Sequence, residues 1–243
     1  MLKKAQISAL VIIAVLVLAG VGIFFIFQKK PENKNISDED SRKVYSFVEN
    51  CIREKAEQGV YYAGMTGGYI KIQTLSNDKN VAYYVYENNS YIPKKEKIEK
   101  ELANYLSDNL GLCLNNFSDF PGLEIKSGEI QTGARIKNGV VSFNADYPLT
   151  IIKSNRTSYL SKFENIEVPI NLEKIYSVAE KITQGQRGSG FLCISCINKI
   201  AVQNGVYVEV SESVLAEDGY VFTIIDENSR INDNAYRFSF AVL

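Results

Sequence analysis

The residues of this sequence with the clearest chemical potential are its four cysteines, Cys51, Cys113, Cys193 and Cys196. The last two form a Cys-x-x-Cys motif near the start of a predicted helix. A helix N-terminus lowers the pKa of a thiol and so favours the reactive thiolate. The motif therefore admits thiol–disulfide exchange, a zinc site made with the other two cysteines, or a disulfide, either local or to another element.

A disulfide is the interpretation that the surroundings favour. No strand with the lead-in of a thioredoxin-like enzyme precedes Cys193. Cys51 lies on the first predicted helix and Cys113 just past the second, both on apolar faces. Joining them closes a loop of about 60 residues and contributes about 4 kcal/mol on the chain-entropy model, against about 2 kcal/mol for Cys193 with Cys196. The alternative is that these cysteines are buried free thiols.

Other catalytic chemistry is restricted by what the composition lacks. The chain has no histidine, which excludes Ser-His and Cys-His mechanisms and His-ligated metal sites within it. A net charge of −1 argues against a nucleic-acid partner. The glycine-containing loop at 185–190 lacks the Gly-Lys-Ser/Thr of a phosphate loop. We therefore expect no catalytic residue, metal site or cofactor unless the Cys-x-x-Cys motif is a redox centre.

One uninterrupted apolar stretch, residues 9–27, determines where the rest of the chain is expected to lie. It contains no charged or polar side chain, and as a helix it would be about 28 Å long, close to the thickness of the hydrocarbon core. A cleaved secretory signal has a shorter apolar core and a small-x-small site, which the Phe-rich end of this stretch lacks. We predict a membrane helix between a basic segment (1–8) and a linker (28–37), with the lipid bilayer as partner.

The first eight residues read Met-Leu-Lys-Lys-Ala-Gln-Ile-Ser. This start resembles an archaeal class III signal, the type cut by prepilin peptidases. The resemblance implies cleavage between Ala5 and Gln6. Leu10 departs from the pattern, because many such pilins carry there a glutamate that registers subunits in a filament. The two lysines also fit the positive-inside rule without any cleavage.

The folded body is expected on the outer side of the membrane. The charges on the two sides of the apolar stretch nearly balance, so they do not decide the orientation. Cysteine usage fits an oxidising compartment. Four Asn-x-Ser/Thr sequons add candidate glycosylation sites at Asn35, Asn88, Asn116 and Asn155. We predict a single-pass protein of the cell membrane with the domain 38–243 outside.

The periodicity of the body predicts an α+β domain, in which antiparallel sheets pack with about four helices and a subdivision falls near residue 120. Apolar residues at 3–4 spacing predict helices at about 38–63, from residue 93 onward, at 171–184 and at 191–203. Alternation predicts a hairpin of 69–75 with 81–86, and strands at 129–137, 140–146, 149–154, 206–210, 220–226 and 236–243. Asn138-Gly139 is a hairpin signal, and Tyr147-Pro148 is expected to interrupt the ladder and predicts an edge or a bend.

Taken together, the start, the apolar helix and this layout resemble uncharacterised single-span envelope proteins of archaea. We accordingly expect a membrane-anchored cell-envelope protein whose outer domain is structural, adhesive or binding. Its partner would be a second copy or another envelope protein. Two alternatives remain open: a pilin-like filament subunit processed after Ala5, and a membrane-anchored thiol oxidoreductase that uses Cys193 and Cys196.

Overall fold

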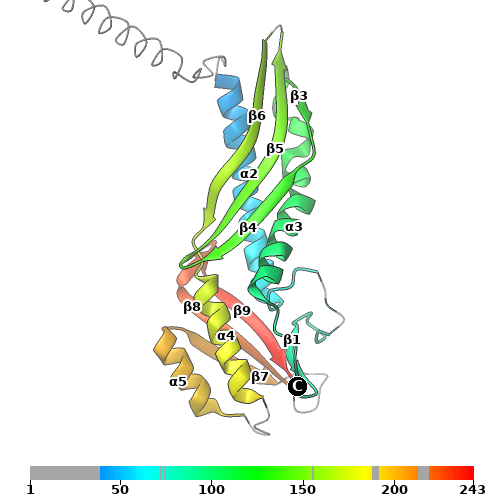
Figure 1. Ribbon diagram of the computed structural model, residues 1–243. Coiled ribbons are helices and arrows are strands. Elements are labelled where there is room, and N and C mark those ends of the chain that lie inside the picture. Colours follow the sequence, from blue (N-terminus) through cyan, green and yellow to red (C-terminus); the bar gives the residue numbers. More distant parts are fainter. Residues whose placement is uncertain (1–38, 72, 74, 155, 188–191, 213–218) are drawn as a thin grey trace, which may run out of the picture. The chain divides into compact units, whose positions relative to one another are not determined.

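The computed structural model describes residues 39–71, 73, 75–154, 156–187, 192–212 and 219–243 (Figure 1). From Glu39 onward the chain forms one compact unit. The predicted basic segment, membrane helix and linker lie outside the described residues, as does the cleavage site between Ala5 and Gln6. Within the described ranges, no helix has the length and hydropathy needed to cross a bilayer.

This unit is α+β, with antiparallel-rich sheets. Its helices are α2 (Glu39–Met65), α3 (Lys95–Leu114), α4 (Leu172–Gln186) and α5 (Ile194–Asn204), and a short 3-10 turn, η1 (Asn115–Phe117), follows α3. Each α-helix lies where the apolar spacing predicts one, with ends that differ by a few residues. The fold class expected for the body is therefore confirmed.

The first sheet is antiparallel and is organised around β5 (Val140–Lys153). Strand β6 (Arg156–Val168) pairs with β5 along nearly its whole length. Strands β4 (Gln131–Lys137) and β3 (Glu124–Ser127) pair with successive halves of β5. Because a strand has only two edges, β4 and β3 must follow one another along the edge opposite β6. Buried and exposed side chains alternate through the first half of β5, so one face of the sheet is packed.

Helices α2 and α3 pack against each other and along this sheet, α2 beside β6 and α3 beside β4 (Figure 1). The ring of Tyr45 on α2 stacks on Phe163 of β6, with ring centroids 4.9 Å apart. On the other side, the Thr132 hydroxyl of β4 donates to the carbonyl of Ala103 in α3 at 2.7 Å. The two helices are therefore fixed to opposite margins of the same sheet.

The second sheet is mixed and has the order β2-β1-β9-β8-β7. Its strands are β1 (Tyr83–Tyr86), β2 (Asn89–Ser90), β7 (Tyr207–Glu212), β8 (Tyr220–Ile231) and β9 (Asn234–Val242). Strand β1 runs parallel to β9, and the other pairs are antiparallel. Phe240 is central to its packing, because it stacks on Tyr84 at 4.8 Å and on Phe222 at 5.2 Å between centroids.

The C-terminal half of α2 also contacts this second sheet. The buried hydroxyl of Tyr236 in β9 donates to the carbonyl of Val60 at 2.9 Å. Gly64 allows the close approach, because a Cβ there would overlap the Arg237 carbonyl and lie 2.8 Å from Tyr236 Oη. The chain then leaves the helix through Gly67 at φ +72°, a conformation that glycine adopts without strain. One helix thus contacts both sheets.

Two predictions about strands were only partly right. The hairpin of 69–75 with 81–86 is reduced to an isolated antiparallel bridge between Ser76 and Ala82, where the Tyr83 amide donates to the Leu75 carbonyl at 3.2 Å. The described residues of 69–75 contain no strand, and β1 pairs with β2 and β9. The interruption of the ladder predicted at Tyr147-Pro148 is present, although β5 continues through these residues as one strand and does not lie at an edge. The register shifts between Asp146 and Leu149, and such an irregularity lets a strand accommodate a proline.

Candidate functional site

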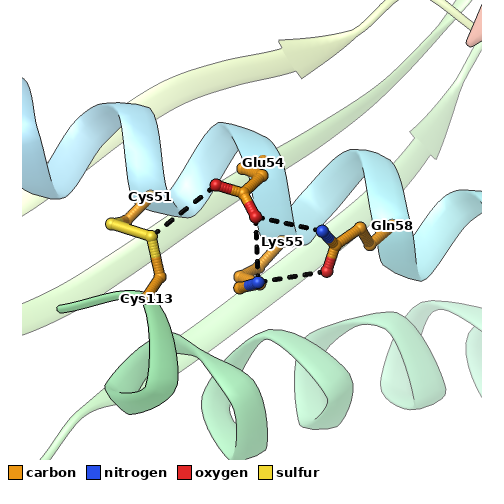
Figure 2. Close-up of a disulfide and its surroundings, with 5 residues drawn as sticks. All are labelled: Cys51, Glu54, Lys55, Gln58 and Cys113. Carbon is orange, nitrogen blue, oxygen red and sulfur yellow. Dashed lines mark hydrogen bonds and ion pairs between the residues drawn. A yellow bond between two sulfur atoms is a disulfide. The ribbon is translucent and has the colours of Figure 1, made fainter. Parts of the chain in front are cut away.

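A disulfide between Cys51 and Cys113 joins the two long helices (Figure 2). The sulfur atoms are 2.04 Å apart, the Cα atoms 5.7 Å apart, and the bond spans 62 positions of sequence. Cys51 lies on the buried stripe of α2 and is only 4% exposed, whereas Cys113 is half-buried. Cys113 belongs to the last turn of α3 rather than to the chain just past it. This is the pairing that the positions of the helices favoured.

The polar side chains beside this disulfide form a closed network on α2 (Figure 2). Glu54 Oε1 accepts hydrogen bonds from Lys55 Nζ and Gln58 Nε2, each at 3.0 Å, and Lys55 Nζ also contacts Gln58 Oε1 at 3.2 Å. The other oxygen of Glu54 lies 3.8 Å from Cys113 Sγ. A carboxylate this close repels an approaching thiolate, and the Lys55 ammonium paired with it offsets part of that charge. Together with the burial of Cys51, these surroundings do not activate the disulfide.

Next to this network the helix pair presents an aromatic surface, made by Tyr61, Tyr62 and Tyr105, which we call the tyrosine face. Tyr61 and Tyr62 are 49% and 47% exposed. Their ring centroids are 5.7 Å apart, and those of Tyr62 and Tyr105 are 5.6 Å apart. The Tyr105 ring lies so close to Gly59 that a Cβ there would be 2.9 Å from it. A missing side chain on α2 thus makes room for the ring of α3.

Tyr105 is the most buried member of the tyrosine face. Burial raises the pKa of Tyr105 above its usual value, and the nearby Tyr62 ring and Glu54 carboxylate raise it further. Its hydroxyl donates to Gln58 Oε1 at 3.5 Å. A surface of half-exposed tyrosines offers both ring faces and hydroxyl groups, which suits contact with another molecule.

The second disulfide joins Cys193 to Cys196 at the start of α5. Cys193 occupies the N-cap position, and its backbone amide donates to Gln186 Oε1 at 3.3 Å. Cys193 Sγ lies 3.6 Å from Ser195 Oγ, and Cys196 is exposed. With all four sulfur atoms in disulfides, no thiolate is left for a four-cysteine zinc site. No cluster of candidate metal ligands occurs among the residues that the structure describes.

Two of the four predicted sequons can be placed. Asn88 lies in the turn between β1 and β2 at φ +63°, and Asn116 lies in η1 at φ +51°. Both residues are exposed, so both are accessible to a modifying enzyme. Asn35 and Asn155 lie outside the described residues.

Sequence reasoning missed a groove of about 360 Å³ between α3 and β4. Its lining includes Glu99, a buried residue whose Oε1 accepts from the Ile136 amide at 2.9 Å and whose Oε2 contacts Arg135 Nη1 at 2.8 Å. Glu99 therefore provides a hydrogen-bond acceptor for the Ile136 amide on the outer edge of β4. The only signal in the sequence was a glutamate directly after the apolar Ile98 on a predicted helix, which does not distinguish an inward carboxylate from a solvated one.

A second inward carboxylate, Glu101, ties the loop that follows α2 to α3. Its Oε2 accepts from the backbone amides of Ile70 and Lys71 at 3.2 and 3.1 Å, and Lys97 Nζ contacts its Oε1 at 2.8 Å. Burial works to raise the pKa of Glu101, but the hydrogen bonds from Lys97, Lys71 and Ile70 outweigh burial and hold the pKa below its usual value. The folded structure thus stabilises the ionised form of the Glu101 carboxylate.

The site residues identified from the sequence therefore separate into two places: Cys51 and Cys113 on the α2–α3 pair, and Cys193 and Cys196 on α5. The tyrosine face lies with the first of them. No protein-family model matches this sequence, and the comparisons with curated proteins and with solved structures found no significant match.

Proposed function

We propose that this chain is a membrane-anchored cell-envelope protein whose body lies outside the membrane as a structural, adhesive or binding domain. The observation that carries the proposal is that all four cysteines are held in disulfides. Such bonds persist in oxidising compartments and are rare in the cytosol. In this proposal the apolar stretch 9–27 is the anchor, because its length and composition suit a bilayer.

The compartment is tested on protein in its native membranes. The membranes are treated with a thiol-alkylating reagent before and after reduction, and the intact mass of the chain is then measured. We expect no alkyl group before reduction, four after it, and retention in the membrane pellet after a carbonate wash. Release by carbonate together with four alkylated cysteines before reduction would overturn the proposal.

The side of the membrane is tested with a membrane-impermeant amine reagent added to intact cells. The described body carries exposed lysines, among them Lys43, Lys126 and Lys153. Labelling of these lysines supports an outer domain. Labelling that appears only after the cells are lysed contradicts it, and a cytosolic protein of the same cells serves as the internal control.

The tyrosine face supports the binding or adhesive role, since two half-exposed rings side by side are unusual for an inert helix surface. Full-length chain in detergent micelles should bind to cell-envelope fragments, and a Tyr61→Ser/Tyr62→Ser double variant should bind more weakly. The matched control is Tyr159→Ser/Tyr207→Ser, which removes two other exposed tyrosines from β6 and β7. Equal binding by both double variants would exclude the tyrosine face as the contact surface.

The pilin-like role remains a second candidate because of the resemblance of residues 1–8 to a class III signal. N-terminal sequencing of the native protein decides it. A chain that begins at Gln6 supports a processed subunit, and a chain that retains Met1 contradicts it.

A further inference from the structure

The two disulfides of this chain lie in opposite chemical surroundings. Cys51 is buried and belongs to a bond that spans 62 positions, with the Glu54 carboxylate next to its partner sulfur. The Cys193–Cys196 bond spans three positions, and Cys196 is an exposed residue. The first turn of α5 contains no acidic residue. An incoming thiolate can therefore reach Cys196 without unfolding the chain and without meeting a carboxylate on that turn.

The position of Cys193 makes it a good leaving group. It is the N-cap residue of an 11-residue helix, where the free backbone amides and the helix dipole favour a negative charge. The Ser195 hydroxyl lies 3.6 Å from its sulfur and can donate to a thiolate there. Exchange is faster when the departing thiol has a low pKa. The arrangement thus directs attack to Cys196 and departure to Cys193.

We propose that Cys193–Cys196 is an exchange-active disulfide that accepts electrons from the paired thiols of a polypeptide. A thiolate of the partner attacks Cys196 Sγ, the Cys193–Cys196 bond breaks, and its electron pair passes to Cys193. The second thiolate of the partner then attacks the partner's own sulfur in the mixed disulfide and releases Cys196. The partner becomes a disulfide, and its two protons finish on Cys193 and Cys196. Exchange in the reverse direction with another disulfide restores the bond.

The surface around the motif favours a polypeptide over a small thiol. Ile194 lies within the motif and is 48% exposed, and Val202, about two turns farther along α5 and about 80° around its axis, is 81% exposed. Exposed apolar side chains of this kind bind apolar segments of other chains. This assignment goes beyond the proposed envelope role and needs only the oxidising compartment that the same four cysteines indicate.

The test uses the full-length chain in detergent micelles, with two probes: a reduced apolar peptide that carries two cysteines, and glutathione. Aliquots are quenched with acid and alkylated, and mass spectrometry then measures which cysteine pair carries the alkyl groups. We expect the peptide to reduce Cys193–Cys196 at least about tenfold faster than Cys51–Cys113, and faster than glutathione does. In a Cys193→Ser variant, oxidised peptide should form a mixed disulfide on Cys196. Equal, slow reduction of both disulfides would overturn the proposal.

The choice of partner is tested separately. In an Ile194→Ser/Val202→Ser variant, the peptide should reduce Cys193–Cys196 at nearly the rate of glutathione, and the rate with glutathione should equal that of the wild type. Leu112→Ser, which removes an exposed leucine from α3, is the control and should change neither rate. If glutathione reacts with the wild-type chain as fast as the peptide does, or if the α5 variant behaves like the control, the polypeptide assignment is wrong.

Discussion

Removing the Cys51–Cys113 bond tests how much of the stability of the body depends on the pairing of its two long helices. In a Cys51→Ala/Cys113→Ala variant the unfolded chain regains the freedom of a loop that spans 62 positions. The chain-entropy model gives about 4 kcal/mol for a loop of that length. A Cys193→Ala/Cys196→Ala variant opens a loop of three positions, for which the same model gives about 2 kcal/mol. The two double variants are therefore matched in chemistry and differ in loop length.

The measurement is thermal unfolding of the full-length protein in detergent, followed by near-ultraviolet circular dichroism of its 15 tyrosines. For a domain of this size each kcal/mol lowers Tm by about 2–4 °C, so we expect a decrease of about 8–16 °C for the long loop and about 4–8 °C for the short one. Wild-type protein in strong reductant is the control, and its Tm should be no higher than that of the first variant.

The reasoning would be refuted if the two double variants unfolded at the same temperature. It would also fail if the free energy of unfolding of the variant without Cys51 and Cys113 fell by less than about 1 kcal/mol. Closing the long loop would then not stabilise the folded state as the chain-entropy model requires. The second result would mean that α2 and α3 remain paired in the unfolded ensemble.

Three further predictions concern the packing and the buried charges. Gly64→Ala should destabilise the fold by about 1–3 kcal/mol, because a Cβ overlaps the second sheet, whereas Gly111→Ala on α3, with open space around it, should stabilise by about 0.5–1 kcal/mol in urea unfolding. Asp226→Ala should lower the free energy of unfolding by about 3 kcal/mol, because the carboxylate is fully buried 2.9 Å from Lys174 Nζ; a loss below about 1 kcal/mol would contradict this. Burial of Glu101 raises its pKa, but hydrogen bonding outweighs burial and holds the pKa below 4.5. The ionised carboxylate therefore adds to the free energy of unfolding in full above pH 4.5, and this stabilisation disappears as the pH falls through the lower pKa of the folded state. Glu101→Gln should therefore be less stable than wild type at pH about 7 but lose less on acidification to about pH 3, and parallel pH curves would refute the assignment.

The helices and the C-terminal strands could be predicted because their signals are local. The buried residues of α2 recur at three- and four-residue spacing from Val44 to Ala63, and alternation along β9 marks its packed side. The partner of β1 could not be predicted, because its parallel pairing with β9 joins Tyr83 to Ala241. Nothing in either strand specifies a partner so far away in sequence. The predicted hairpin with the nearest apolar stretch survives only as the Ser76–Ala82 bridge, and the long-range pairing supplies the ladder of β1.

The candidate site was predictable to a similar extent. Loop length and helix position favoured the pairing of Cys51 with Cys113, because both cysteines lie on apolar helix faces. The tyrosine face was not found, since Tyr105 belongs to the apolar stripe of α3 in sequence and only the approach of α3 over Gly59 brings it beside Tyr62. Two adjacent tyrosines off the stripe of α2, Tyr61 and Tyr62, were the available signal.

The bond between the long helices also determines how the chain transmits mechanical tension. If tension enters the chain at Glu39 and leaves at Leu243, the covalent path runs from Cys51 directly to Cys113 through the sulfur atoms and bypasses the residues between them. Fully extended, that segment would be about 220 Å long. While the bond is closed, this length cannot extend even if the fold gives way under load, whereas after reduction the same unfolding would add all of it to the length of the chain.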